Sequence, residues 1–329
     1  MRYASLMTEE NFRTVLVANP NSQNGALGRK WSQLSAVIAA SFGPFHHRFT
    51  RGVGDGTLQT RAALDEGYEM VVAMGGDGTI SEVVDGFFDH RGPRRAGAVL
   101  GVLHFGTGGD FRRTIAAPTK LADGARALRG RATTDVDVGR LTYVANDGSP
   151  AVRHFANIAS FGIGGLVDKF VNESSKALGG RISFAVATLR AMRRYSPQRA
   201  RIRLDGGAPR EVTLQNVAVA NGQYFGGGMH IAPTAKLDDG LFDVVALGPL
   251  SLGDMIFRGH KVYSGTHLEM PQVSLAQARQ VDAEPVDPGD EILLDVDGET
   301  PGRLPARFEL LPRALRLKSL VLPVGGSMT

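Results

Sequence analysis

The stretch that decides the fold is "MVVAMGGDGTISEVVDGFF", which runs from Met70 to Phe88. An apolar run ends in the loop GGDGT at residues 75–79, and a helix-like pattern follows over residues 79–88. Consecutive glycines let backbone N–H groups converge on an anion, and the helix after them adds its positive end. A strand–turn–helix junction also needs such residues as a plain tight turn. The loop alone therefore leaves two interpretations, a turn and a phosphate cradle.

The first 135 residues alternate strand-like and helix-like segments. The expected strands are residues 13–20, 45–50, 68–74 and 96–105. The expected helices are residues 29–40, 55–66 and 79–88. This order predicts an α/β domain over residues 1–135, with a parallel sheet that is covered on both faces.

Each loop that is rich in glycine, asparagine or serine follows one of these strands. "NPNSQNG" follows the first strand, "GGDGT" the third and "GTGGDFRR" the fourth. The carboxyl ends of parallel strands lie at one edge of a sheet, and ligands bind there in such folds. Three donor loops at one edge suit a nucleotide polyphosphate, although none of them matches the Gly-Lys-Ser/Thr pattern of a Walker loop.

Strands dominate the sequence from residue 136 to residue 312 and predict a second, β-rich domain that is sandwich-like or barrel-like. The expected strands are residues 135–145, 152–162, 200–205, 211–222, 241–248, 291–298, 306–311 and 314–320. Turns at residues 146–148 and 205–207 have the composition of hairpin connections. Two helices are expected, at residues 180–194 and 251–264.

Composition limits the class of protein. The 329 residues are enough for two domains, and 43% hydrophobic with 21% charged residues argues against wholesale disorder. The absence of cysteine excludes disulfides and thiolate metal sites and favours a reducing compartment. The first 13 residues lack the apolar core of a secretory signal, and no uncharged apolar run is long enough for a membrane span. We therefore expect a soluble, cytoplasmic protein.

The charge balance is basic, with a formal net charge of +4. Arginines cluster at residues 91–95, 112–113, 126–131 and 190–203. Such clusters favour phosphates or an anionic membrane surface, and each can also be a solvated face. Aromatic residues do not alternate with the arginines, so a nucleic-acid partner is not expected.

The expected helix at residues 180–194 has one apolar face with arginines beside it. The apolar face comprises Ile182, Val186, Leu189 and Met192, and the arginines are Arg190 and Arg194. Peripheral contact with an anionic membrane and packing in the core are the two interpretations of this pattern.

Two carboxylate motifs in the second half can be turns or chemical groups. In "DVDGETPG", Asp297 and Glu299 flank a hairpin-like tip, where a carboxylate is exposed to remove a proton from a hydroxyl. In "AKLDDGLFDV", Asp238 and Asp239 are turn formers or oxygen ligands for Mg²⁺. The dispersed histidines lack metal-binding spacing, so His46, His47 and His104 are assigned structural roles.

Taken together, the motifs resemble the diacylglycerol kinase catalytic family, the lipid kinases that include sphingosine kinases. The resemblance extends over nearly the whole chain. It rests on "NPNSQNG", "GGDGTISEVVDG", "GTGGDFRR", "FANIASFGIGG", "NGQYFGGGMHIAPTAKLDDGLFDVV" and "VDGE", in this order. It implies a phosphofructokinase-like domain that binds ATP, a β-rich domain, a cleft between them, and a segment 313–329 that returns to the first domain. It also makes the glycine loop a phosphate cradle.

The resemblance implies a set of site residues. The ATP-binding residues would be Asn19, Pro20, Asn21, Ser22, Gly25, Thr50, Gly75, Gly76, Asp77, Gly78, Thr79, Glu82, Thr107 and Asp110. The catalytic residues would be Glu299 as proton acceptor, Asp297 beside it, and Asp77. A structural Mg²⁺ would be held by Lys236 and Leu241 through main-chain carbonyls and by Asp239 through its carboxylate. The expected reaction is transfer of the ATP γ-phosphoryl group to a lipid hydroxyl at a membrane surface.

One departure from the family pattern bears on activity. The usual motif is Gly-Thr-(Gly/Ala)-Asn-Asp-Phe, and this chain has Gly109 in place of the asparagine. Because that amide is absent, a second interpretation stays open, in which the protein binds nucleotide or lipid but is inactive. An NAD kinase is a further alternative, because that family has a similar G-G-D-G-T loop but lacks the "NP…S…NG" opening and the late D-G-E. The acceptor lipid and the oligomeric state are left open.

Overall fold

The structure is a computed structural model that describes residues 11–165, 197–249 and 258–318. The expected helix at residues 180–194, with its apolar face and arginines, lies outside the described residues, as does part of the one expected at 251–264. Within the described ranges, no helix is both long enough and apolar enough to span a membrane.

The first half of the chain forms a parallel sheet in the order β6-β3-β1-β2. The strands are β1 (Thr14–Ala18), β2 (His46–Phe49), β3 (Met70–Gly75) and β6 (Val99–His104). Every residue of β1 and β3 is buried. Alternate residues pack on opposite faces, with Val15 and Val17 in one core and Leu16 and Ala18 in the other. The run of apolar residues thus reflects a sheet covered on both faces, and the α/β prediction is confirmed.

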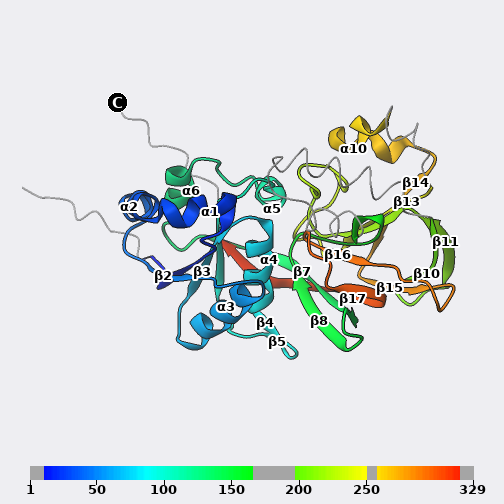
Figure 1. Cartoon of the computed structure of the whole chain (residues 1–329), viewed down its shortest axis with the longest axis horizontal. Helices are drawn as coiled ribbons and strands as arrows, with labels where there is room; N and C mark the ends of the chain where they lie inside the picture. The colour runs from blue at the N-terminus through cyan, green and yellow to red at the C-terminus, as the bar shows by residue number, and fades with distance from the viewer. Residues whose placement is uncertain (1–10, 166–196, 250–257, 319–329) are drawn as a thin grey trace, which may run out of the picture.

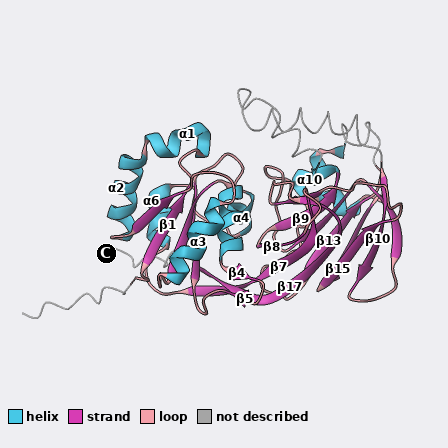
Figure 2. Ribbon diagram, turned by 60° about the horizontal axis from the view of Figure 1, so that its bottom comes forward, coloured by secondary structure: helices cyan, strands magenta, loops and turns pink. Residues whose placement is uncertain are grey.

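Helices cover the two faces of this sheet. The helices α3 (Asp55–Asp65) and α4 (Asp77–Gly86) pack on one face, while α2 (Trp31–Phe42) and α6 (Leu121–Ala127) pack on the other. Two shorter helices, α1 (Ser22–Arg29) and α5 (Asp110–Thr114), begin in the loops after β1 and β6. Figure 2 shows these helices gathered around the parallel strands.

The second half is a sandwich of two antiparallel layers, as predicted. One layer has the order β14-β13-β12-β9-β16. Its strands are β9 (Ile158–Gly162), β12 (Asn216–Ala220), β13 (Phe242–Leu247), β14 (Val273–Ala278) and β16 (Leu294–Val296). The other layer contains β7 (Thr133–Ala145), β8 (Pro150–Phe155), β10 (Gln198–Leu204), β11 (Arg210–Leu214), β15 (Gln280–Pro285) and β17 (Gly302–Lys318). Phenylalanines fill the space between the layers, among them Phe155, Phe161, Phe242 and Phe308.

The long strand β17 joins the two halves into one ten-stranded sheet (Figure 1). It pairs antiparallel with β15 and β7 in the sandwich. Near its end it pairs in parallel with β6, with Arg316 opposite Val99 and Leu317 opposite Leu100. The described end of the chain therefore lies in the first domain.

Three of the predicted strand boundaries are wrong. Residues 152–162 form two strands, β8 and β9, and residues 211–222 form β11 and β12. The two strands of each pair belong to different layers of the sandwich, because the chain crosses from one layer to the other at Asn157 and at Gln215. Conversely, the strands expected at 306–311 and 314–320 are one strand, β17, with an irregularity between Leu311 and Leu315. A proline within a β-strand pattern marks such a bulge, and Pro312 lies there.

Small elements that the sequence did not indicate complete the fold. The strands β4 (Phe88–Asp89) and β5 (Gly92–Pro93) form a short hairpin after α4. A 3₁₀ turn (Thr266–Glu269) and the strands β14 and β15 were not predicted either. The helix α10 (His260–Ser264), by contrast, lies within the helix expected at residues 251–264.

Candidate active site

The three donor loops meet at the carboxyl edge of the parallel sheet. The Asn19 N–H donates to the Met74 carbonyl at 3.0 Å, and the Phe105 N–H donates to the Gly75 carbonyl at 2.7 Å. The side-chain amide of Gln23 donates to the Gly106 carbonyl at 3.4 Å. The loops after β1, β3 and β6 thus form one continuous surface.

Close approach of two backbones explains the glycines of this surface. A Cβ at Gly106 would lie 2.6 Å from the Gly76 Cα, a distance that real side chains do not show. The loops after β3 and β6 could not come this close with a larger residue at position 106.

Helix α4 begins in this surface with its first amides free. Gly76 occupies its N-cap position, and no side chain caps it. Among the described residues, no acceptor lies within hydrogen-bond distance of the N–H groups of Asp77, Gly78 and Thr79. The Thr79 hydroxyl accepts a 3.3 Å hydrogen bond from the Asn19 amide instead. Free amides and the positive end of a helix dipole suit a phosphate group, so the site fits a nucleotide.

Asp77 holds the loop after β6. Its carboxylate accepts the Gly109 N–H at 2.6 Å and the Phe111 N–H at 3.3 Å. Both oxygens are therefore engaged with main-chain amides. In this geometry Asp77 is a positioning residue, and its predicted catalytic role stays a prediction.

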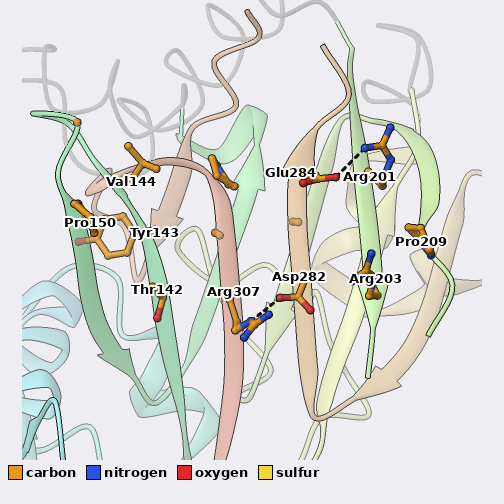
Figure 3. Close-up of a pocket in the computed structure, with 14 residues that line it drawn as sticks. Thr142, Tyr143, Val144, Pro150, Arg201, Arg203, Pro209, Asp282, Glu284 and Arg307 are labelled. Carbon is orange, nitrogen blue, oxygen red and sulfur yellow. Dashed lines mark hydrogen bonds and ion pairs between the residues drawn. The ribbon is translucent and has the colours of Figure 1, made fainter. Parts of the chain in front are cut away.

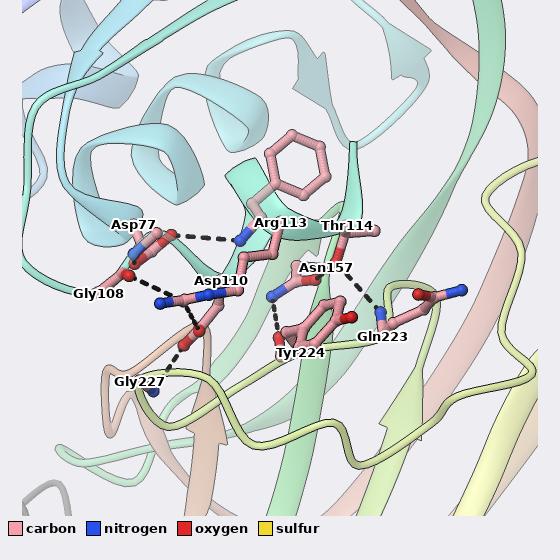
Figure 4. Close-up of polar contacts among 11 residues, drawn as sticks. Asp77, Gly108, Asp110, Arg113, Thr114, Asn157, Gln223, Tyr224 and Gly227 are labelled. Carbon is pink, nitrogen blue, oxygen red and sulfur yellow. Dashed lines mark hydrogen bonds and ion pairs between the residues drawn. The ribbon is translucent and has the colours of Figure 1, made fainter. Parts of the chain in front are cut away.

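Asp110 links the two domains. Its carboxyl group is buried, and it accepts the Gly227 N–H at 2.7 Å and a 2.8 Å hydrogen bond from the Arg113 guanidinium. Burial, and then the nearby charge of Asp77, raises the pKa of Asp110 to about 6, against the opposing effects of Gly227 and Arg113. Figure 4 shows this carboxylate between helix α5 and the loop that carries Gly227.

A second link lies one turn along α5. The Thr114 hydroxyl bonds the Asn157 side chain at 3.2 Å and accepts the Gln223 N–H at 3.2 Å. The Asn157 amide also donates to the Tyr224 carbonyl at 2.9 Å (Figure 4). Short helix α5 is thus anchored to the sandwich at both ends.

The hairpin tip after β16 brings the predicted catalytic carboxylates to the same place. Glu299 pairs with Arg153 at 2.7 Å, and its other oxygen lies 3.3 Å from the Cβ that Gly78 would carry. Arg153 also donates to the Ser81 hydroxyl at 3.1 Å, so one guanidinium contacts both the hairpin and α4. A carboxylate from the second domain therefore contacts the first turn of α4.

Asp297 lies behind Glu299. Its carboxylate accepts the Ile158 N–H at 3.1 Å. Burial raises the pKa of Asp297 to about 7, while the Ile158 amide and Arg153 oppose this change. Asp297 can therefore accept or release a proton near neutral pH.

Other residues predicted to bind ATP surround this centre. Glu82 accepts the N–H groups of Gly54 and Gly56, each at 2.7 Å, and so caps helix α3 rather than facing a ligand. Thr50 is buried, and its N–H donates to the Ala18 carbonyl at 3.0 Å. Thr107 is exposed at the rim of the loop after β6. The remaining ones, Pro20, Asn21, Ser22 and Gly25, lie in the loop after β1 and in α1.

The predicted magnesium loop lies between β12 and β13. Asp239 is exposed, and one carboxylate oxygen accepts the Leu241 N–H at 3.1 Å. Its second oxygen and the main-chain carbonyls of Lys236 and Leu241 are donors of the kind that Mg²⁺ prefers. The described residues contain no group of three or more Asp, Glu, His or Cys side chains arranged to hold a metal. The loop thus fits a weakly charged oxygen site, and the metal stays a prediction.

A groove of about 460 Å³ lies elsewhere, on the outer face of the sandwich (Figure 3). Four of its charged residues form ion pairs: Arg201 with Glu284 at 2.8 Å, and Arg307 with Asp282 at 2.6 Å. It includes none of the donor loops, so we assign the active site to the junction of the two domains.

The sequence did not indicate the arginines and the amide that connect the site. Arg153, Arg113 and Asn157 come from a strand, a helix and a crossing point, and their partners are distant in the chain. The available signals were the paired arginines of "GGDFRR" and the motif "FANIASFGIGG", which contains Asn157, and neither indicated an interdomain contact.

Comparisons with known proteins agree with this two-domain organisation. Residues 13–141 match the model of the diacylglycerol kinase catalytic domain. Residues 157–319 match the model of the YegS C-terminal NAD kinase beta sandwich-like domain.

Individual relatives cover most of the chain. A diacylglycerol kinase of Staphylococcus carnosus is 29% identical over 79% of this chain and 79% of its own length. A diacylglycerol kinase of Staphylococcus aureus is 28% identical over 80% of this chain and 78% of its own. The solved structure of a candidate diacylglycerol kinase from Bacillus anthracis is 25% identical, with a TM-score of 0.71 over 94% of this chain and 98% of that one.

Proposed function

We propose, since the chain belongs to the diacylglycerol kinase catalytic-domain family, that it transfers the γ-phosphoryl group of ATP to a hydroxyl group of a lipid. The lipid class is diacylglycerol or a related lipid alcohol such as a sphingoid base. The diacylglycerol kinases named among its relatives support the first of these. The protein would act in the cytoplasm and meet its acceptor at a membrane surface.

One observation carries the proposal: the Glu299 carboxylate lies against Gly78, in the turn whose amides are free to bind phosphate. A phosphate on those amides would be close to a carboxylate that can accept a proton. Phosphoryl transfer requires this combination of an anion cradle and a base.

The reaction would proceed in line. The lipid hydroxyl oxygen forms a bond to the γ-phosphorus, the bond from that phosphorus to the bridging oxygen breaks, and ADP leaves with the electron pair. Glu299 takes the hydroxyl proton, and Arg153 fixes the position of its carboxylate. The amides at the start of α4 stabilise charge on the transferred group. Asp297 provides a second proton-accepting group beside the base.

Mg²⁺ would neutralise phosphate charge when bound with the nucleotide. A separate structural Mg²⁺ would be held by the carbonyls of Lys236 and Leu241 and the carboxylate of Asp239. Its role there is to fix the loop next to β13.

The test is transfer of labelled phosphate from γ-labelled ATP, with Mg²⁺, into a mixed lipid extract presented in micelles. Wild type should label a lipid, whose identity gives the acceptor. Glu299→Gln should lower turnover by at least about 100-fold, because general-base catalysis contributes about 10²–10⁴-fold. ATP binding should change by less than about threefold, since the loop amides remain. The matched control is Glu309→Gln, which removes a carboxylate on β17 that pairs with Arg140.

Two alternatives give different results in the same assay. Binding of ATP without any labelled acceptor would favour a non-catalytic nucleotide-binding protein, which Gly109 keeps open. Labelling of added NAD instead of lipid would favour an NAD kinase. Full turnover of Glu299→Gln would remove Glu299 from the mechanism.

A further inference from the structure

The space beside Gly109 is filled by another side chain. Gly109 is buried, and a Cβ placed on it would lie 3.1 Å from His104 Nε2 and 3.2 Å from Arg112 Nε. An imidazole and a guanidinium therefore lie against the position at which the usual pattern has an asparagine.

The backbone at this position accepts both residue types. Gly109 has φ 80° and ψ 38°, the left-handed region. Asparagine is the side-chain-bearing residue that tolerates this region best, together with aspartate. Asparagine would therefore be less strained here than most side chains. Its Cβ would nevertheless lie only 3.1 Å from His104 Nε2, so the imidazole would have to shift to make room.

His104 stands at the end of β6, between the two glycine loops. Its Cε1 lies 3.0 Å from the Cβ that Gly106 would carry, on the side of the Gly76 contact. Its Nδ1 is buried and has no partner among the described residues. The other ring nitrogen, Nε2, is the one that points toward Gly109.

We propose that His104 takes the place of the missing amide and donates a hydrogen bond from Nε2 to the phosphates of the bound nucleotide. This inference rests on the proposed function, because it assumes that a nucleotide occupies the loops. It assigns a binding role to a residue whose sequence context suggested only a structural one, and it accounts for the departure at Gly109.

The charges around the ring agree with a neutral donor. Burial lowers the pKa of His104, and Arg112 and Arg113 add to this change, whereas Asp77 and a hydrogen bond to the Gly106 main chain oppose it. An anion beside Nε2 would favour the neutral tautomer that carries its hydrogen on that nitrogen. Arg112 supplies the positive charge at the same place.

The experiment is a double-mutant cycle on the full-length protein, with ATP affinity measured by calorimetry and lipid labelling measured in parallel. His104→Ala should weaken ATP binding about tenfold, the effect of losing one hydrogen bond to a charged group. His104→Gln retains an N–H donor and should lose less than about threefold. Gly109→Asn alone should also weaken binding, because its side chain would displace the ring. The double variant His104→Ala/Gly109→Asn should recover to within about threefold of wild type, because the amide then has room.

The control is His90→Ala, which removes an exposed imidazole in the β4–β5 hairpin and should bind ATP as wild type does. Unchanged ATP affinity of His104→Ala would overturn the inference, and so would a double variant no better than His104→Ala. If Gly109→Asn does not fold, as a thermal melt would show, the comparison of His104→Ala with His104→Gln decides alone. If wild type binds ATP but labels no lipid, the proposed function is refuted and this inference is unaffected. If wild type does not bind ATP, both are refuted.

Discussion

The buried carboxyl of Asp110 should make folding stability depend on pH in a direction opposite to that of most aspartates. Its pKa is raised from 3.8 to about 6, first by burial and then by Asp77. A folded-state pKa above the unfolded value means that the folded chain binds the proton more tightly. The contribution of Asp110 to stability is then greatest below pH 4, and it is lost as the pH rises through about 6.

The size of the effect follows from the same two values. At about 1.36 kcal/mol per pH unit, the interval from 3.8 to about 6 corresponds to about 3 kcal/mol over the whole titration. Between about pH 4.5 and about pH 7.5 the change should be about 2 kcal/mol. Asp110→Asn does not titrate, so the stability of wild type minus that of the variant should fall by this amount. Asp110→Asn also changes the contacts to Gly227 and Arg113, but the free-energy cost of this is the same at both pH values and cancels when they are compared.

Urea unfolding followed by circular dichroism at several pH values in this range provides the assay. Asp65→Asn is the control, because Arg94 lowers the pKa of that exposed carboxyl. Both the folded and the unfolded pKa of Asp65 lie at or below 3.8, so the stability of wild type minus that of Asp65→Asn should stay constant over this pH range and fall only at lower pH. A wild-type minus Asp110→Asn difference that is the same at both ends of the range would refute the reasoning.

Two other substitutions test the packing of the site. Arg153→Met should lower the free energy of unfolding by about 1–3 kcal/mol, because it leaves the Glu299 carboxylate unpaired at the domain junction. An unchanged midpoint of urea unfolding would contradict this. Gly106→Ala should lower the free energy of unfolding by about 1–3 kcal/mol and weaken ATP binding, because its Cβ would overlap Gly76. Gly289→Ala is the control: the space around Gly289 is open, so this variant should melt as wild type does.

The sequence predicted those parts of the fold that depend on a pattern among neighbouring residues. The strands at Thr14–Ala18 and Met70–Gly75 follow from apolar runs between turn residues, and the parallel order follows from the alternation with helices. It failed at Asn157 and Gln215, where an apolar run continues while the chain changes layers. Nothing local distinguishes such a crossing from a continuous strand, because both sides of it are buried.

The candidate site also has parts that the local sequence predicts and parts that it does not. The loops were visible as turn residues after strands, whereas the approach of Glu299 to Gly78 depends on how two domains meet. That contact was expected only through the family resemblance. The neighbour of Gly109 was missed because His104 was judged by its spacing from other histidines. A missing side chain in a tight loop would have been the better guide to what fills its place.

The strand β17 has a consequence for how the chain folds during synthesis. Because it is the last described strand and pairs with β6, the first domain has an unpaired sheet edge until residues 302–318 have been made. An open edge is a site for pairing with other chains. The folding of the first domain thus waits for the end of the second, against the usual order in which an N-terminal domain folds first. Truncation before residue 302 should therefore cause aggregation of both halves rather than release a stable first domain.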